Sequence, residues 1–223
     1  MTKLIKLVIL GGGTSCIETI DLINQINIFN KNKIKIIGIL DDDKKIQKKK
    51  INGHLVLGKI NTYKKYKDCN FFLNIFSYKN RFIRQKLINS LGKIRKKFIN
   101  LIHPHSLISN NATLGFGNII YNNCNIFGKS KIGNFNILYP NVSIAPNSEI
   151  KDNIFLAKNV ALGLKSKIYN SCSIQINTAI LENVKLSNGI RTMPNSIITE
   201  TFTQKNIIIG GYPARFITYE KKK

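Results

Sequence analysis

An aliphatic side chain recurs at every sixth position through the second half of the chain. The series begins at Ile108 and ends at Ile198, and each of its sixteen members is Ile or Leu except Thr192. Four positions after most members stands a small or β-branched residue, such as Cys124 or Ser148. No residue is inserted anywhere in the series, so the period holds over the whole stretch.

This six-residue period predicts a left-handed parallel β-helix over residues 108–198. Three hexads would form one triangular coil, with the Ile or Leu side chain stacked inside and the small residue near a corner. One coil cannot bury its apolar face alone, so neighbouring coils have to stack on each other. The remaining positions are rich in Asn, Lys, Gly, Ser and Asp, which suit tight turns. We expect about five coils and no long projecting loop.

The first half of the chain has apolar segments of a different kind. The expected strands cover residues 6–10, 34–40, 71–76 and 98–102, and the expected helices cover residues 17–28 and 80–91. Strands that alternate with helices predict a parallel sheet covered by helices. The predicted fold class is therefore α/β plus all-β. It has a small Rossmann-like domain over residues 1–102, followed by the β-helix domain and C-terminal tail over residues 103–223.

Two polar segments follow expected strands of the α/β half. Gly11-Gly12-Gly13 comes after the first strand, where a glycine turn lets the backbone approach a phosphate at a helix N-terminus. Asp41-Asp42-Asp43 ends the second strand, and α/β sheets bind ligands at the carboxyl ends of their strands. A simple chain reversal and a solvated loop remain the alternatives for these two segments.

The net charge and the cysteine content limit which partners the chain is expected to have. The net charge is +24, which favours polyanionic ligands or nucleic acid. Apart from residues 44–50, 95–97 and 221–223 the charges are dispersed, and no aromatic residues alternate with them, so we do not expect nucleic acid as a partner. The four cysteines are neither in CxxC spacing nor close to a histidine, so we expect neither a metal site nor disulfides.

No segment approaches the roughly 20 apolar residues of a membrane helix. The first ten residues lack the apolar core and the cleavage site of a signal peptide. We therefore expect a cytoplasmic protein without membrane contact.

The order of these features resembles a known family. The chain contains an α/β unit, then His103-Pro104, then the series of Ile and Leu at every sixth position (the hexad ladder), and then residues 211–215 (Gly-Tyr-Pro-Ala-Arg). In this order it resembles the bacterial sugar O- and N-acyltransferases related to the sialic acid O-acetyltransferase. Within that family, the chain is most similar to the acetyltransferases of nucleotide-linked amino deoxysugars, which feed polysaccharide synthesis. The resemblance implies a homotrimer in which acetyl-CoA, as co-substrate, lies along the β-helix between two subunits. It also implies that the N-terminal domain holds the sugar nucleotide and that no metal is used.

The resemblance carries site residues over to this chain. The family's glycine turn continues with Gly-His, but here Thr14 and Ser15 stand in those places. The positions implied to bind the sugar nucleotide are Gly11, Gly12, Gly13, Ser15, Asp41, Asp42, Ser77 and Tyr78. The positions that hexad alignment implies for acetyl-CoA are Ala157, Gly163, Asn177, Thr192 and Met193.

The chain departs from the family at the catalytic position. The family's general base is a histidine on a middle coil, usually followed by an acidic residue. Hexad alignment places Pro146 and Asn147 there, and neither can accept a proton. His103 matches a structural entry to the β-helix, and His54 and His105 lie outside the matching coil. We therefore carry no catalytic histidine over.

Three consequences of this departure stay open. Catalysis can proceed without a protein base, because positioning promotes attack by a free amine on a thioester and a backbone amide can stabilise the oxyanion. Glu149 or Tyr139, from either subunit, can serve instead. The protein can also be an inactive ligand-binding trimer. Since a hydroxyl is a weaker nucleophile than an amine, the first case favours N-acetylation, with sugar O-acetylation as the alternative. A polyanion-binding trimer is the reading that the charge alone favours.

Overall fold

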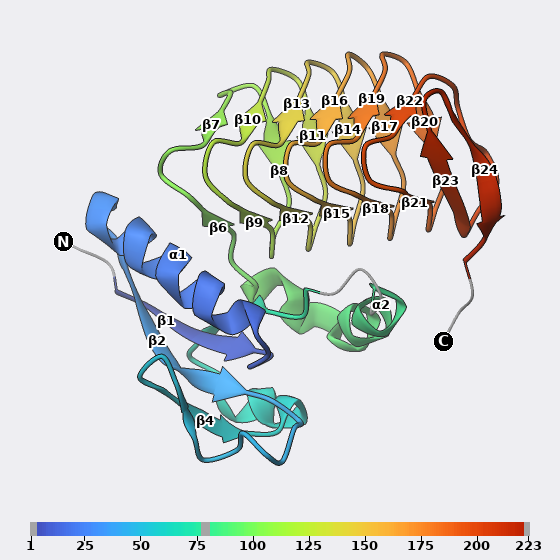
Figure 1. Cartoon of the computed structure of the whole chain (residues 1–223). Coiled ribbons are helices and arrows are strands. Elements are labelled where there is room, and N and C mark those ends of the chain that lie inside the picture. The colour runs from blue at the N-terminus through green and yellow to red at the C-terminus, as the bar shows by residue number, and fades with distance from the viewer. Residues whose placement is uncertain (1–3, 77–80, 221–223) are drawn as a thin grey trace.

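A computed structural model describes residues 4–76 and 81–220. An α/β unit and a β-helix follow each other along the chain. Figure 1 shows the two units side by side, with α1 (Ser15–Phe29) lying between the N-terminal sheet and the first coils. The predicted mixture of an α/β part with many parallel strands is confirmed.

The N-terminal unit is built on one mainly parallel sheet, hydrogen-bonded in the order β3-β4-β2-β1-β5. Its strands are β1 (Leu4–Leu10), β2 (Lys33–Leu40), β3 (Lys50–Ile51), β4 (His54–Gly58) and β5 (Asn70–Leu73). β1 pairs in parallel with β2 and β5, and β3 pairs antiparallel with β4. From Leu7 to Leu10 the side chains are fully buried, as expected for a central parallel strand covered on both faces. The carboxyl ends of β1, β2 and β5 therefore lie together at one edge.

Helical segments cover this sheet. Among the described residues they include α1, α2 (Arg81–Ser90) and the short 3-10 segments Ile60–Lys65 and Gly92–Lys97. α1 buries Cys16, Ile20 and Ile23 in a core that also contains Ile119 and Ile137 of the β-helix. The two units therefore pack against each other through an apolar cluster to which both contribute, separate from the cluster inside the β-helix.

The β-helix has three flat faces of stacked two-residue strands. One face contains β7 (Leu107–Ile108), β10 (Asn125–Ile126), β13 (Ser143–Ile144), β16 (Ala161–Leu162), β19 (Ala179–Ile180) and β22 (Ile197–Ile198). The second contains β8 (Thr113–Leu114), β11 (Lys131–Ile132), β14 (Glu149–Ile150), β17 (Lys167–Ile168) and β20 (Lys185–Leu186). The third contains β6 (Leu101–Ile102), β9 (Ile119–Ile120), β12 (Ile137–Leu138), β15 (Phe155–Leu156), β18 (Ser173–Ile174) and β21 (Arg191–Thr192), followed by β23 (Ile207–Gly211) and β24 (Ala214–Tyr219).

The hexad ladder forms the interior of this prism, as predicted. Ile144 pairs in register with Ile126 on one side and with Leu162 on the other, eighteen residues apart in sequence. The small residues Cys124 and Cys172 are fully buried beside the ladder. Parallel in-register stacking explains why the period tolerates no insertion, because one extra residue would turn the following side chains outward.

The β-helix begins one hexad earlier than predicted. Residues 98–102 were expected to be the last strand of the α/β sheet, but Leu101–Ile102 forms β6 and pairs with β9 of the β-helix. Phe98 makes an isolated β-bridge with Phe71 of the N-terminal unit, and Ile99 donates its backbone N–H to Phe71 at 3.1 Å. The physical reason is that Ile102 stands six residues before Ile108 and therefore continues the ladder.

The corners of the prism use left-handed backbone conformations. Asn141, Asn159 and Asn177 occupy equivalent corner positions with φ of 64°, 61° and 56°. Their side chains hydrogen-bond in a column, with Asn141 donating to Asn159 at 3.0 Å and Asn159 to Asn177 at 2.9 Å. Asparagine tolerates this conformation better than other non-glycine residues, which explains the richness of the corners in Asn.

Replacing Asn159 with alanine should lower the free energy of unfolding by about 1–2 kcal/mol. Alanine is sterically disfavoured in the left-handed conformation and lacks the polar side chain that hydrogen-bonds locally in asparagine. Asn159→Gly should cost less than half as much, since glycine adopts positive φ without steric penalty. Urea denaturation followed by circular dichroism measures both. Equal losses for the two variants would show that the side-chain column, rather than the backbone conformation, sets the cost.

Candidate functional site

A cavity of about 460 Å³ opens at the carboxyl ends of the central strands of the N-terminal sheet. Its wall combines the glycine turn after β1, the start of α1, the ends of β2 and β5, and one side chain of the β-helix. The lining residues are Gly11, Gly13, Thr14, Ser15, Glu18, Asp41, Asn74, Ile75, Phe76 and Tyr139. This first cavity therefore brings together four positions that the sequence assigned to the sugar nucleotide: Gly11, Gly13, Ser15 and Asp41.

The glycine turn is held by hydrogen bonds from both sides. Gly11 has a φ of +112°, and a Cβ added there would lie 2.5 Å from the backbone oxygen of Asn74. The backbone N–H of Gly12 donates to Oδ2 of Asp41 at 2.6 Å. Asp43 donates its backbone N–H to the other carboxylate oxygen of Asp41 at 2.8 Å. Both oxygens of Asp41 therefore brace the loops of the site.

Asn74 is a site residue that the sequence analysis missed. The residue is 2% exposed. Its side chain accepts a hydrogen bond from the Thr19 hydroxyl at 2.7 Å and donates one to the backbone oxygen of Gly11 at 3.0 Å. It follows β5 directly, so its position at the carboxyl end of a parallel strand was the available signal. The predicted apolar strand over residues 71–76 in fact ends at Leu73, and the chain turns into the cavity there.

Two predicted nucleotide-binding positions lie outside the cavity wall. A Cβ on Gly12 would meet Ile51 and Ile46 rather than open space. The Asp42 carboxylate accepts the backbone N–H of Ile60 at 3.0 Å. Gly12 and Asp42 therefore support the loops rather than face the cavity, whereas Ser77 and Tyr78 fall outside the described residues.

A second cavity of about 300 Å³ adjoins the first between α1 and the β-helix. The two cavities share Glu18 of α1 and Tyr139 of the β-helix. The other lining residues of the second cavity are Asp21, Leu22, Gln25, His103, Tyr121, Pro140 and Lys158. His103 was expected away from the catalytic coil, at the entry to the β-helix, but the fold brings it to the cavity that Tyr139 lines.

The periodicity of the β-helix explains this grouping. His103, Tyr121 and Tyr139 are eighteen residues apart, so they occupy the same position on successive coils. The rings of Tyr121 and Tyr139 stack with centroids 5.0 Å apart and an angle of 21° between their planes. On the next coils the same column continues with Ala157 and, two coils further, Met193. The stacked rings of Tyr121 and Tyr139 therefore lie in the same column as Ala157 and Met193, two of the positions predicted for acetyl-CoA.

The titratable groups of the second cavity are tuned by burial. Desolvation, and then the nearby Glu18 carboxylate, raise the pKa of Tyr139 to about 12, so its phenol stays protonated at neutral pH. Desolvation and the neighbouring His105 lower the pKa of His103, so its imidazole is neutral there. Nδ1 of His103 accepts the backbone N–H of His105 at 3.1 Å. The neutral ring therefore carries its proton on Nε2 and has no free lone pair for a base.

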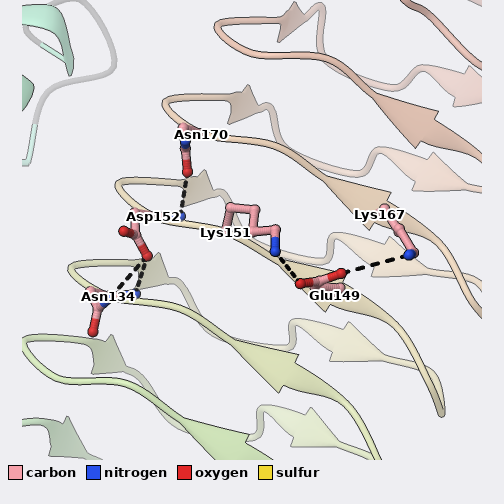
Figure 2. A network of polar contacts seen from close by, with 6 residues as sticks. All are labelled: Asn134, Glu149, Lys151, Asp152, Lys167 and Asn170. Atoms are coloured by element: carbon pink, nitrogen blue, oxygen red, sulfur yellow. Dashed lines mark hydrogen bonds and ion pairs between the residues drawn. The ribbon is translucent and has the colours of Figure 1, made fainter.

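The position aligned with the family's histidine lies at a different corner of the prism. Pro146 and Asn147 follow β13, and Asn147 adopts a φ of 58° as a corner residue. Glu149, named as a weak candidate for the base, forms an ion pair and hydrogen bond with Lys151 and lies 3.7 Å from Lys167 (Figure 2). These lysines hold the pKa of Glu149 below its usual range, chiefly through the hydrogen bond from Lys151. A carboxylate with a lowered pKa is a weak base at neutral pH.

Figure 2 also shows an asparagine and aspartate column at the third corner. Asp152 accepts the backbone N–H of Asn134 at 2.7 Å, and Asn170 accepts the backbone N–H of Asp152 at 3.0 Å. These side chains satisfy the backbone donors where the chain leaves each coil. We read this column as structural.

The positions predicted for acetyl-CoA are placed in different surroundings. Ala157, Asn177 and Met193 lie along one corner of the prism, and Gly163 lies at the next corner. Thr192 is fully buried inside the prism, where its hydroxyl accepts the backbone N–H of Gln175 at 2.8 Å. The side chain of Thr192 is therefore directed into the prism, so the predicted contact with acetyl-CoA would have to use its backbone atoms. The reason is that Thr192 occupies a ladder position.

Within residues 4–76 and 81–220, no three histidine, cysteine, aspartate or glutamate side chains cluster as metal ligands do. No helix in that part of the chain is long and apolar enough to span a membrane. All four cysteines lie within the described residues, where they are buried and form no disulfide bond.

Comparison with known proteins gives a fold likeness and no sequence match. No protein-family model matches the chain, and no curated protein matches it. Among solved structures, PerB from Caulobacter crescentus in complex with CoA and GDP-perosamine superposes with a TM-score of 0.81 at 18% identity, covering 95% of this chain and 97% of that chain. The acetyltransferase domain of PglB from Neisseria gonorrhoeae FA1090, in complex with acetyl coenzyme A, gives a TM-score of 0.83 at 17% identity, covering 95% and 98%.

WeeI from Acinetobacter baumannii AYE gives a TM-score of 0.65 at 17% identity, covering 96% of this chain and 100% of that chain. At this identity the likeness is one of fold. The chain therefore shares, over nearly its whole length, the fold of PerB and of the acetyltransferase domain of PglB, and the predicted resemblance is confirmed at the level of the fold.

Proposed function

We propose that the protein transfers the acetyl group of acetyl-CoA to the amine of a nucleotide-linked amino deoxysugar. The observation that carries this proposal is the first cavity, in which a glycine turn and a helix N-terminus meet a tyrosine of the β-helix. Backbone N–H groups and the helix dipole favour a phosphate at the start of α1. A ligand with a diphosphate there would extend its sugar toward the β-helix.

Two further points support the proposal. The N-terminal sheet has parallel strands whose carboxyl ends surround the cavity, as in Rossmann-like nucleotide-binding units. The similar structure of PerB is described with CoA and GDP-perosamine, which are the two ligand classes proposed here. We take acetyl-CoA as a co-substrate that lies along the β-helix of a homotrimer, and light scattering would measure the trimer directly.

Sugar O-acetylation is the second candidate. The departure at Pro146 disfavours it, because a hydroxyl needs a base more than a free amine does. An inactive ligand-binding trimer is the third candidate. It predicts nucleotide or CoA binding in calorimetry without turnover.

Purified protein mixed with acetyl-CoA and a panel of UDP-, dTDP- and GDP-linked amino sugars should release the free thiol of CoA with at least one of them. The same sugars with a hydroxyl in place of the amine serve as controls and should give no release. The absence of release with any amino sugar would contradict the proposed activity, and release with the hydroxyl controls alone would assign O-acetylation.

A further inference from the structure

The missing histidine leaves open which group takes the amine proton, and this further inference rests on the proposed function. Four residues of types that serve as bases line the two cavities: Glu18, Asp21, Asp41 and His103. Both oxygens of Asp41 accept backbone N–H groups, and Nδ1 of His103 accepts one as well. Asp21 accepts a long hydrogen bond of 3.4 Å from Asn52 and lines only the second cavity.

Glu18 differs from the other three in position and in partners. It lines both cavities, at their junction with Tyr139. Among the residues that the structure describes, none makes a hydrogen bond or an ion pair with its carboxylate. Glu18 is an exposed residue at the start of α1. Its lone pairs are available to a ligand.

The location of Glu18 fits a sugar amine rather than a hydroxyl. Glu18 stands three residues beyond Ser15, about 4.5 Å along the helix from the N-terminus where a diphosphate would bind. A carboxylate so close to phosphate groups repels the ligand unless the ligand brings a cationic or strongly hydrogen-bonding group to it. The amine of an amino sugar supplies such a group.

Tyr139 is placed to act on the second reactant, the thioester of acetyl-CoA. Its phenol remains protonated at neutral pH, so it donates a hydrogen bond and does not accept a proton. The column of Ala157 and Met193 runs along the prism from Tyr139, with coils about 4.8 Å apart. A pantetheine chain bound along that column would bring its thioester to the phenol.

We propose that Glu18 accepts the amine proton and that Tyr139 donates a hydrogen bond to the thioester oxygen, so that acyl transfer takes place between α1 and the β-helix of one subunit. The amine, having lost its ammonium proton to solvent, attacks the carbonyl carbon and forms the C–N bond. Its second proton passes to the Glu18 carboxylate while the Tyr139 hydroxyl stabilises the oxyanion. The C–S bond then breaks, and the leaving thiolate takes the proton from Glu18.

Glu18→Gln and Tyr139→Phe should each lower kcat/KM for the amino-sugar nucleotide by roughly a hundredfold, with little change in thermal unfolding. Glu200→Gln, which makes the same charge change at an exposed ion pair with Arg215, should leave kcat/KM unchanged. Calorimetry adds a readout that a folding defect would not produce. Glu18→Gln should bind the nucleoside diphosphate alone at least as tightly as the unmodified protein, because a repulsive charge is gone.

The outcomes separate this inference from the proposed function. An active unmodified enzyme with Glu18→Gln retaining kcat/KM within about threefold overturns the role of Glu18 and leaves the N-acetyltransferase proposal standing. A hundredfold loss together with weakened binding of the nucleoside diphosphate would assign Glu18 to the structure of the turn and would also overturn the inference. An unmodified enzyme that is inactive with every amino sugar overturns both proposals.

Discussion

Gly11→Ala should lower the free energy of unfolding by about 2–5 kcal/mol, because it adds a strained backbone conformation and a steric overlap. It should also remove nucleotide binding. The φ of +112° at Gly11 lies in a region that only glycine occupies readily. A Cβ there would lie 2.5 Å from the backbone oxygen of Asn74, and backbone cannot move aside as a flexible side chain does. Because Asn74 and Asp41 brace the same turn, its distortion would reach the cavity wall.

Gly13→Ala is the matched control for this prediction. A Cβ on Gly13 would meet no atom within 4 Å, and Gly13 does not have a positive φ. Its free energy of unfolding should stay within about 0.5 kcal/mol of that of the unmodified protein. Denaturant titrations give the stabilities, and calorimetry with UDP, dTDP and GDP gives the binding. Equal stability losses in the two variants would mean that the tight packing of the turn around Gly11 is not what holds it.

Leu156→Ala should lower the free energy of unfolding by about 2–5 kcal/mol, the usual cost of a cavity in a close-packed core. Leu156 is fully buried and pairs in register with Leu138 below it and Ile174 above it. A shorter side chain removes contacts on both neighbouring coils. The prism interior cannot collapse to fill the space, since its width is set by the three faces.

Leu107→Ala serves as the control for the interior, because Leu107 is 71% exposed on the first coil. Its free energy of unfolding should change by no more than about 0.5 kcal/mol. Urea denaturation followed by circular dichroism measures both variants. A small effect at Leu156 would contradict the account in which ladder stacking stabilises the β-helix.

The sequence predicted the β-helix well because its physics is local and repetitive. A residue at position 144 meets those at 126 and 162 whatever the rest of the chain does, so one period fixes the interior. The start of the ladder was missed at Ile102, where an apolar segment fitted both a sheet strand and a coil. Periodicity alone could not decide between them, since both bury alternate side chains.

The candidate site was predicted only in part, for a different reason. Gly11 and Asp41 carry local signals, a glycine turn and an acid at a strand end. Asn74 carries only its place after an apolar strand, and Glu18 carries no local signal, because their roles arise from contacts between distant segments. His103 and Tyr139 are thirty-six residues apart, and their shared column becomes visible only once residues outside the ladder are also read at the eighteen-residue coil period.

The mass of the product formed from acetyl-CoA and a nucleotide-linked amino sugar tests the central claim most directly. The account predicts a sugar nucleotide that is heavier by one acetyl group, with an amide at the former amine and free CoA in equal amount. An unchanged sugar nucleotide, or acetylation at a hydroxyl while the amine stays free, would contradict it.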